Sequence, residues 1–208
     1  IKFSHGKKVN IDGIDVWAQR LSYVGEIGFE LYVKIDDSKK LFLTIVNEGK
    51  NHNLSLCGAH AMDIMRMESG FLHWGHDISP EENQYQAGLQ FAISYKKNIN
   101  FIGKEALLKI KDQKPTKLLA MMVLKDNKPG QPLLLHEEPI YLDDKIIGRT
   151  TSGNYSFNFE KNISFGYVNS GNTIENLLDK NLSIEIEKKK YPVSLIQKPP
   201  NQKNIKNA

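Results

Sequence analysis

Cysteine is almost absent from this chain of 208 residues, in which Cys57 is the only one. One thiol cannot form an intrachain disulfide or a cysteine-based metal site, so the composition indicates a reducing compartment, and we expect a cytoplasmic protein. We interpret Cys57 as a buried apolar filler rather than a nucleophile. Long apolar runs are absent too: no segment approaches the roughly 20 residues that a membrane span requires, so no membrane partner is expected.

An excess of charge of one sign is also missing. The 28 Lys and Arg residues nearly balance the 24 Asp and Glu residues, and the net charge of +4 is scattered rather than gathered in a basic stripe. This distribution argues against nucleic acid as a partner and is compatible with a small polyanionic ligand. The hydrophobic fraction of 40% and the charged fraction of 25% are those of a folded globular chain.

Hydrophobic periodicity predicts a mixture of helices and strands in the first half. Residues 14–22 alternate apolar and polar side chains, which is typical of a half-buried strand, and Gly25 and Gly28 bracket a turn. Helices are predicted where apolar residues recur at helical spacing after capping residues or before glycine. The remaining elements predicted here are a strand at 29–34, helices at 36–48 and 59–68, a strand at 89–94 and a short helix at 105–111.

The pattern changes after a polar segment at 113–116, which contains Pro115 and is the predicted domain boundary. Short strands separated by turn residues follow, a spacing typical of a small antiparallel barrel. We therefore predict an α+β protein with domains at 1–112 and 113–198 and a loose tail at 199–208. The predicted barrel strands are 117–124, 138–142, 145–152, 163–168, 182–187 and 190–196.

Three stretches together carry a resemblance to a known family. They are residues 21–33 (LSYVGEIGFELYV), residues 58–78 with 86–89 (including GAHAMDIMRMESG, HWGHDI and QAGL), and residues 148–153 (GRTTSG) with 161–168 (KNISFGYV). In this order and spacing they resemble the glycine-cleavage T-protein superfamily of folate-dependent aminomethyltransferases. The HWGHD form of the middle motif, with FIGKEAL at 101–107, is similar to the C-terminal folate region of dimethylglycine and sarcosine dehydrogenases.

This resemblance implies a fold and an incomplete unit. The fold would be the C-terminal part of the aminomethyltransferase fold, mixed helix and antiparallel sheet, followed by a small antiparallel β-barrel. The family's catalytic aspartate lies in the N-terminal half of its unit, and no stretch here matches that motif, so we expect a fragment without a catalytic residue of its own. Where a flavin domain exists in such proteins it precedes the folate region, so FAD is expected only in an upstream domain.

Two residues of the first motif are implied as ligands of tetrahydrofolate, the expected cofactor. A carboxylate can accept hydrogen bonds from the adjacent amide N–H and exocyclic amine of a pterin, and the resemblance assigns this role to Glu30. Strand alternation agrees, because Glu30 and Tyr32 would face away from Phe29 and Leu31; the alternative is an edge-strand charge facing solvent. Tyr23, before the glycine turn, is the second candidate, with a core tyrosine as its alternative.

Three further cofactor-binding candidates are weaker. The classical aminomethyltransferases carry a folate-binding arginine where this chain has Met62, and Arg66, one turn along the helix, is a possible substitute, unless it only pairs with Asp63 or Glu68. Trp74 could line the cofactor channel or anchor a loop. Tyr155 is a candidate because Ser152, Gly153 and Tyr155 resemble a loop that leans over the family's active site.

Residues His73, His76 and Asp77 have metal-ligand chemistry, but no further ligand is spaced near them, so we predict a structural role and no metal site. The sequence thus favours a folate-binding part of a protein related to dimethylglycine or sarcosine dehydrogenase, which captures one-carbon units from a methylated amine as 5,10-methylenetetrahydrofolate. The alternatives are a glycine-cleavage T-protein, a demethylase of another methylated osmolyte, and a non-enzymatic folate-binding or purely structural module.

Overall fold

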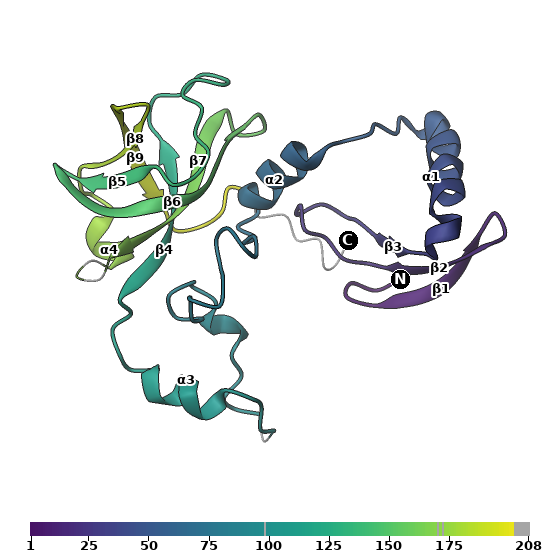
Figure 1. The fold of residues 1–208 in the computed structure, drawn as a ribbon, viewed down its shortest axis with the longest axis horizontal. Coiled ribbons are helices and arrows are strands. Elements are labelled where there is room, and N and C mark those ends of the chain that lie inside the picture. The colour runs from purple at the N-terminus through teal and green to yellow at the C-terminus, as the bar shows by residue number, and fades with distance from the viewer. Residues whose placement is uncertain (98, 170, 172, 202–208) are drawn as a thin grey trace. The chain divides into compact units, whose positions relative to one another are not determined.

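The computed structural model describes residues 1–97, 99–169, 171 and 173–201. The chain forms two compact units, one made of residues 1–71 with the segment that begins at Asn201, the other of residues 72–200 (Figure 1). The boundary predicted near residue 113 falls inside the second unit, because segment 72–112 bonds to the barrel. Leu119 N–H, for example, donates to the carbonyl of Gln86 at 2.8 Å.

The first unit is built on a three-stranded antiparallel sheet in the order β1-β2-β3. Asp12 and Gly13 join the first two strands and both have positive φ, as a two-residue hairpin that matches the strand twist requires. The buried and exposed side chains of β2 alternate, which confirms the predicted strand, whereas β1 was not predicted. The bounds are β1 Gly6–Ile11, β2 Ile14–Gln19 and β3 Glu30–Tyr32.

Helix α1 (Ile35–Gly49) covers this sheet by packing Leu41 against Ile14 and Val16. It begins at Ile35, one residue before the predicted start, so Asp36 and Asp37 lie within its first turn, where their negative charges interact favourably with the helix dipole. The 3-10 helix η1 (Lys50–His52) follows. The extended segment after it leaves the only cysteine exposed, so the prediction of a buried Cys57 was wrong.

Helix α2 (Ala59–Glu68) has the predicted bounds. Ile64 and Met67 are buried together with Arg66 and Glu68, whereas Met62 is exposed. The tail predicted at 199–208 is described only as far as Asn201, whose backbone N–H donates to the carbonyl of Glu68 at 2.8 Å; residues 202–208 lie outside the described part of the chain.

Segment 72–112 of the second unit is largely irregular. The strand predicted at 89–94 was wrong, because this apolar run pairs with no strand and instead forms the 3-10 helix η2 (Gln90–Ala92) through local bonds. Leu89 N–H, for instance, donates to the carbonyl of Gln84 at 2.8 Å. Helix α3 (Lys104–Ile110) confirms the short helix predicted at 105–111.

The rest of the second unit is a closed antiparallel barrel in the order β4-β7-β6-β5-β8-β9, with β9 pairing back onto β4 (Figure 1). All six predicted strands are present, and the predicted α+β fold with a small antiparallel barrel is confirmed. Alternate apolar residues such as Met122, Ile184 and Val193 fill the barrel interior. The bounds are β4 Lys117–Leu124, β5 Pro139–Leu142, β6 Lys145–Ser156, β7 Lys161–Asn169, α4 Ile174–Leu177, β8 Leu182–Ile186 and β9 Lys189–Ile196.

Candidate functional site

Strand β3 presents Glu30 and Tyr32 on one face, as the alternation predicted. The Tyr32 hydroxyl donates a hydrogen bond to Oε2 of Glu30, which requires both side chains to lie on the same side of the strand. This hydrogen bond, together with the negative charge of Glu30, raises the pKa of Tyr32 above its ordinary value of 10.0. Glu30 Oε1 accepts no hydrogen bond from the described residues, so half of the carboxylate remains available to a ligand.

Two exposed aromatic rings share the face that carries this carboxylate. Tyr32 is 53% exposed, and Trp17 of β2, which pairs with Tyr32 in the ladder, is 43% exposed. Phe29 and Leu31 alternate with Glu30 and therefore point to the opposite face. A carboxylate near exposed aromatic rings suits a flat ligand that has both a ring face and polar hydrogens on its edge.

Tyr23 lies on the turn that leads into β3 and packs against the end of α2. Its ring stacks on that of Phe71, with centroids 6.4 Å apart and planes 12° from parallel. The turn itself is tied to the helix end, because Ser69 Oγ donates to the carbonyl of Val24 at 3.3 Å. Gly25 has a φ of +72°, so this turn uses a conformation that favours glycine.

Arg66 is held in the interior of the first unit, with only 1% of its surface exposed. Its Nε and Nη2 contact Asp63 Oδ1 at 2.9 and 2.8 Å, and Nη1 donates to the carbonyl of Phe71 at 3.1 Å. The pairing with Asp63 was the alternative to a ligand role, although the pair is largely buried rather than superficial. Direct contact between Arg66 and folate stays a prediction; what the structure displays is a link from α2 to the residue on which Tyr23 stacks.

The other two candidates belong to the second unit. Trp74 is 65% exposed, so it is not the packed anchor that one reading expected. Tyr155 is buried, and its ring meets that of Phe157 edge to face with centroids 5.1 Å apart. The loop expected at 152–155 is part of strand β6, because these residues continue the ladder with β7.

The anchor of the loop at 73–78 is Asp77, for which the sequence predicted a structural role without identifying its partners. Its buried carboxylate accepts hydrogen bonds from two hydroxyls of β6, Thr151 at 2.6 Å and Ser152 at 2.8 Å, and from the backbone N–H of His73 at 2.9 Å. The Tyr167 hydroxyl of β7 donates to its carbonyl at 2.9 Å. Asp77 thus fastens the loop that carries Trp74 to two barrel strands.

Three histidines gather beside this loop. The rings of His73 and His76 are 4.5 Å apart, and the ring of His136 lies 6.2 Å from that of His76. Among the described residues no group of three His, Cys, Asp or Glu side chains has an arrangement that could hold a metal ion. The contacts present are those of packed rings.

Comparison with known proteins agrees with this architecture. Residues 1–97 match the family described as GCVT N-terminal domain, and residues 117–201 match the glycine cleavage T-protein C-terminal barrel domain. The chain belongs to the glycine-cleavage T-protein superfamily. The second match spans the barrel, and the first contains Tyr23, Glu30, Arg66 and Trp74.

Relatives within the superfamily include larger oxidoreductases and aminomethyltransferases. The chain is 33% identical over 200 residues to the mitochondrial dimethylglycine dehydrogenase of Mus musculus, covering 95% of this chain and 22% of that protein. It is 38% identical over 154 residues to the formaldehyde-forming 4-methylaminobutanoate oxidase of Paenarthrobacter nicotinovorans, covering 74% and 18%. It is 37% identical over 168 residues to an aminomethyltransferase of Symbiobacterium thermophilum, covering 80% and 44%.

A solved structure shares the fold. The aminomethyltransferase T of the Bartonella henselae glycine cleavage system superposes with a TM-score of 0.81 at 22% identity, covering 97% of this chain and 54% of that one. The chain therefore spans about half the length of this aminomethyltransferase, and a smaller share of the oxidoreductases. None of the helices formed by the described residues has the length and apolar character that crossing a membrane requires.

Proposed function

We propose that this chain is a tetrahydrofolate-binding part of an aminomethyltransferase-like unit of the kind found in dimethylglycine dehydrogenase. In the whole protein, a one-carbon unit from a methylated amine would be captured as 5,10-methylenetetrahydrofolate. The observation that carries the proposal is the exposed carboxylate of Glu30, which is oriented by Tyr32 and lies within the region that matches the family's N-terminal domain.

The donor and acceptor chemistry of this face fits the pterin edge. A pterin presents an amide N–H beside an exocyclic amine, and a carboxylate can accept both in charge-assisted hydrogen bonds. The Tyr32 hydroxyl occupies Oε2 of Glu30 and limits the rotation of the carboxylate, which leaves Oε1 and a second lone pair of Oε2 for the ligand. The exposed rings of Tyr32 and Trp17, which pair across β3 and β2, supply aromatic surface on the same face.

The remaining residues of the first unit act by positioning. Asp63 orients Arg66, Arg66 holds the carbonyl of Phe71, and the Phe71 ring supports Tyr23. Bound tetrahydrofolate would supply the nitrogens that receive the one-carbon unit. The task of this chain's residues is to hold those nitrogens in a fixed place, since correct placement of reacting groups is itself a large part of catalysis.

A glycine-cleavage T-protein is the second candidate, favoured by the 37% identity to the Symbiobacterium aminomethyltransferase. Met62 argues against it, because the classical members are expected to carry a folate-binding arginine there, and Met62 is an exposed side chain on α2. The two candidates differ in the source of the one-carbon unit. A cytoplasmic location remains part of the proposal, although relatives such as the dimethylglycine dehydrogenases are mitochondrial proteins.

Titration calorimetry of this chain with tetrahydrofolate tests the proposal. Hydrogen bonds to a charged group contribute about 1.5–3 kcal/mol each, so Glu30→Ala should weaken binding by at least about tenfold. Tyr32→Phe should weaken it less, because the carboxylate remains. Glu48→Ala, an exposed carboxylate on α1, is the matched control and should leave the affinity unchanged.

Two results would count against the proposal. If the parent chain and Glu30→Ala bind tetrahydrofolate equally well, the assignment of the pterin to Glu30 on β3 is wrong. No binding by a sample that melts cooperatively would favour the structural-module alternative for this part of the protein.

A further inference from the structure

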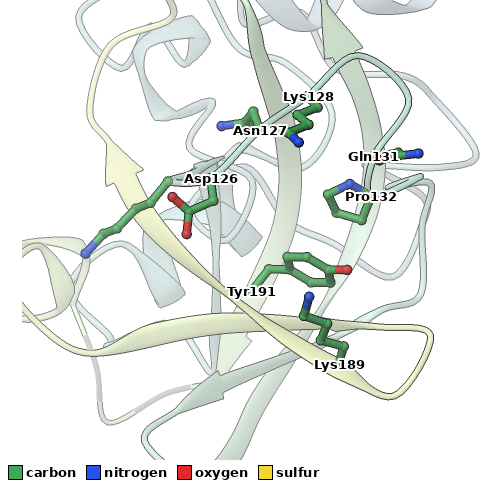
Figure 2. A pocket seen from close by; sticks show the side chains of 8 residues that line it. Asp126, Asn127, Lys128, Gln131, Pro132, Lys189 and Tyr191 are labelled. Carbon is green, nitrogen blue, oxygen red and sulfur yellow. The ribbon is translucent and has the colours of Figure 1, made fainter.

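A hollow of about 530 Å³ opens at one end of the barrel, where β4 ends and β9 begins (Figure 2). It belongs wholly to the second unit and contains none of the residues assigned to folate. Its volume lies within the range of small-molecule sites, and barrel mouths are common places for them. The residues that line it are Lys125, Asp126, Asn127, Lys128, Gln131, Pro132, Lys189 and Tyr191.

An aromatic ring separates this hollow from the barrel core. Tyr191 is partly buried and packs against the core cluster, two residues before Val193, whose side chain points into the barrel. The amine of Lys189 lies 5.0 Å from the centre of the Tyr191 ring. Figure 2 shows the two side chains next to each other. The hollow therefore combines an apolar ring with a cation placed over it.

The lining has a net positive charge that the described residues do not neutralise. Lys125 and Lys128 form no ion pair with any residue that the structure describes, and Asp126 is the one carboxylate among three lysines. Two other lysines of this unit do form ion pairs, Lys117 with Glu82 and Lys190 with Asp144. Three cations around one concave surface attract anions more strongly than scattered surface lysines do.

Asn127, in the wall of the hollow, is held in place by the chain around it. Its Oδ1 accepts a hydrogen bond from the backbone N–H of Asn162 at 2.6 Å, and its Nδ2 donates to the carbonyl of Leu124. Asn162 itself is 1% exposed and does not line the hollow. The wall that faces the three lysines is therefore fixed by hydrogen bonds rather than free to rearrange.

We propose that this barrel mouth binds a small organic anion that carries two oxyanion groups, either carboxylates or phosphates. Lys125, Lys128 and Lys189 hold the two charges, and the Tyr191 ring contacts the ligand's apolar part. Asp126 limits the preference to two charges, because a third anionic group would approach its carboxylate. The site is separate from the proposed folate face, so each can fail without the other.

Binding of pyrophosphate and of the dicarboxylate glutarate to the full chain tests this site, with side-chain amide signals followed by ¹H–¹⁵N NMR. We expect saturable shifts of the Asn127 and Gln131 side-chain amide resonances, which line the hollow, with at least one of the two probes. A response to pyrophosphate alone assigns a phosphate ligand, and a response to glutarate alone assigns a carboxylate ligand. The double variant Lys125→Gln/Lys128→Gln should weaken binding at least tenfold.

Lys188→Gln is the matched control, because Lys188 lies in the adjacent turn but does not line the hollow. It removes a nearby charge and should change the affinity by less than twofold. Weakening by Lys188→Gln equal to that caused by either lining lysine would mean general electrostatic attraction and would overturn the site. So would the absence of saturable shifts with both probes in a sample whose spectrum is that of a folded protein.

Discussion

Replacing Asp77 by alanine should detach the loop at 73–78 from the barrel and destabilise the second unit. The carboxylate is 1% exposed and accepts hydrogen bonds from three donors, the hydroxyls of Thr151 and Ser152 and the N–H of His73. Alanine removes every one of these acceptors. The donors stay where water reaches them poorly, because both hydroxyl-bearing residues are themselves buried.

The magnitude follows from these three bonds. A hydrogen bond to a charged acceptor contributes about 1.5–3 kcal/mol net, and buried donors left unpaired add to the loss. The two hydroxyls can rotate toward other acceptors and the effects of neighbours are not additive, so we expect a loss of about 3–5 kcal/mol in the free energy of unfolding. For a unit of this size that corresponds to a fall of about 10–20 °C in Tm.

Scanning calorimetry resolves this change if the two units melt as separate transitions. Asp77→Asn should be intermediate: its amide oxygen can serve the hydroxyls, but its NH₂ group would face the N–H of His73. Asp179→Ala, an exposed aspartate of the same unit, is the control. If Asp77→Ala lowers the stability by no more than this control does, the cost of burying the carboxylate offsets its hydrogen bonds, and the anchoring role is refuted.

Three further changes have defined outcomes. Burial opposes ionisation of Glu82, but hydrogen bonds from Lys117 and Ser79 outweigh it and lower its pKa, so Glu82→Gln should cost stability at pH 7. In urea titrations at several pH values that cost should shrink as the pH falls below the ordinary value of 4.5, and a pH-independent cost would contradict the ion pair. Gly25→Ala should destabilise the first unit by about 2–4 kcal/mol in thermal melts, because φ is +72° and the new Cβ would lie 1.9 Å from Ser69 Oγ; Gly28→Ala, with its nearest contact at 3.1 Å, should cost less. Asn162→Leu should raise the free energy of unfolding, measured by urea titration, by about 1–2 kcal/mol, because it removes two unpaired buried polar atoms. A lower free energy of unfolding would show that the amide has hydrogen-bond partners in solution.

The barrel was predictable because its information is local. Its strands are short runs that are apolar, as in β4, or that alternate apolar and polar residues, as in β8. Turn-forming residues such as Asp143 and Asp144 separate them, so their bounds could be placed to within a few residues. The same rule failed at 89–94, where an apolar run exists but no neighbouring strand offers a ladder. Periodicity describes a strand's faces and says nothing about whether a hydrogen-bonding partner is present.

The candidate site was only partly predictable. The shared face of Glu30 and Tyr32 follows from alternation over three residues, and the structure has it. The fate of Arg66 depends on burial of the whole α2 face, which depends on tertiary contacts. A structural role was predicted for Asp77, but its partners were not, because the two hydroxyls lie 74 and 75 residues further along the chain, a separation that no local pattern spans.

The candidate residues fall into two groups, exposed ones that can contact a ligand and buried ones that position the segments around it. Glu30 and Tyr32 are exposed, adjacent on one strand and able to meet a ligand directly, and their geometry is set by the strand itself. Arg66 and Asp77 are almost fully buried, and each fixes a segment that carries an aromatic candidate. Arg66 holds Phe71 beneath Tyr23, and Asp77 holds the loop of Trp74. Burying a charged group is costly unless it forms hydrogen bonds, and both Arg66 and Asp77 form them. Each bonds to a backbone group near an aromatic candidate, and such satisfied buried networks make the segments rigid. Changes at the exposed pair should therefore alter affinity with little effect on stability, whereas changes at the buried pair should alter both together.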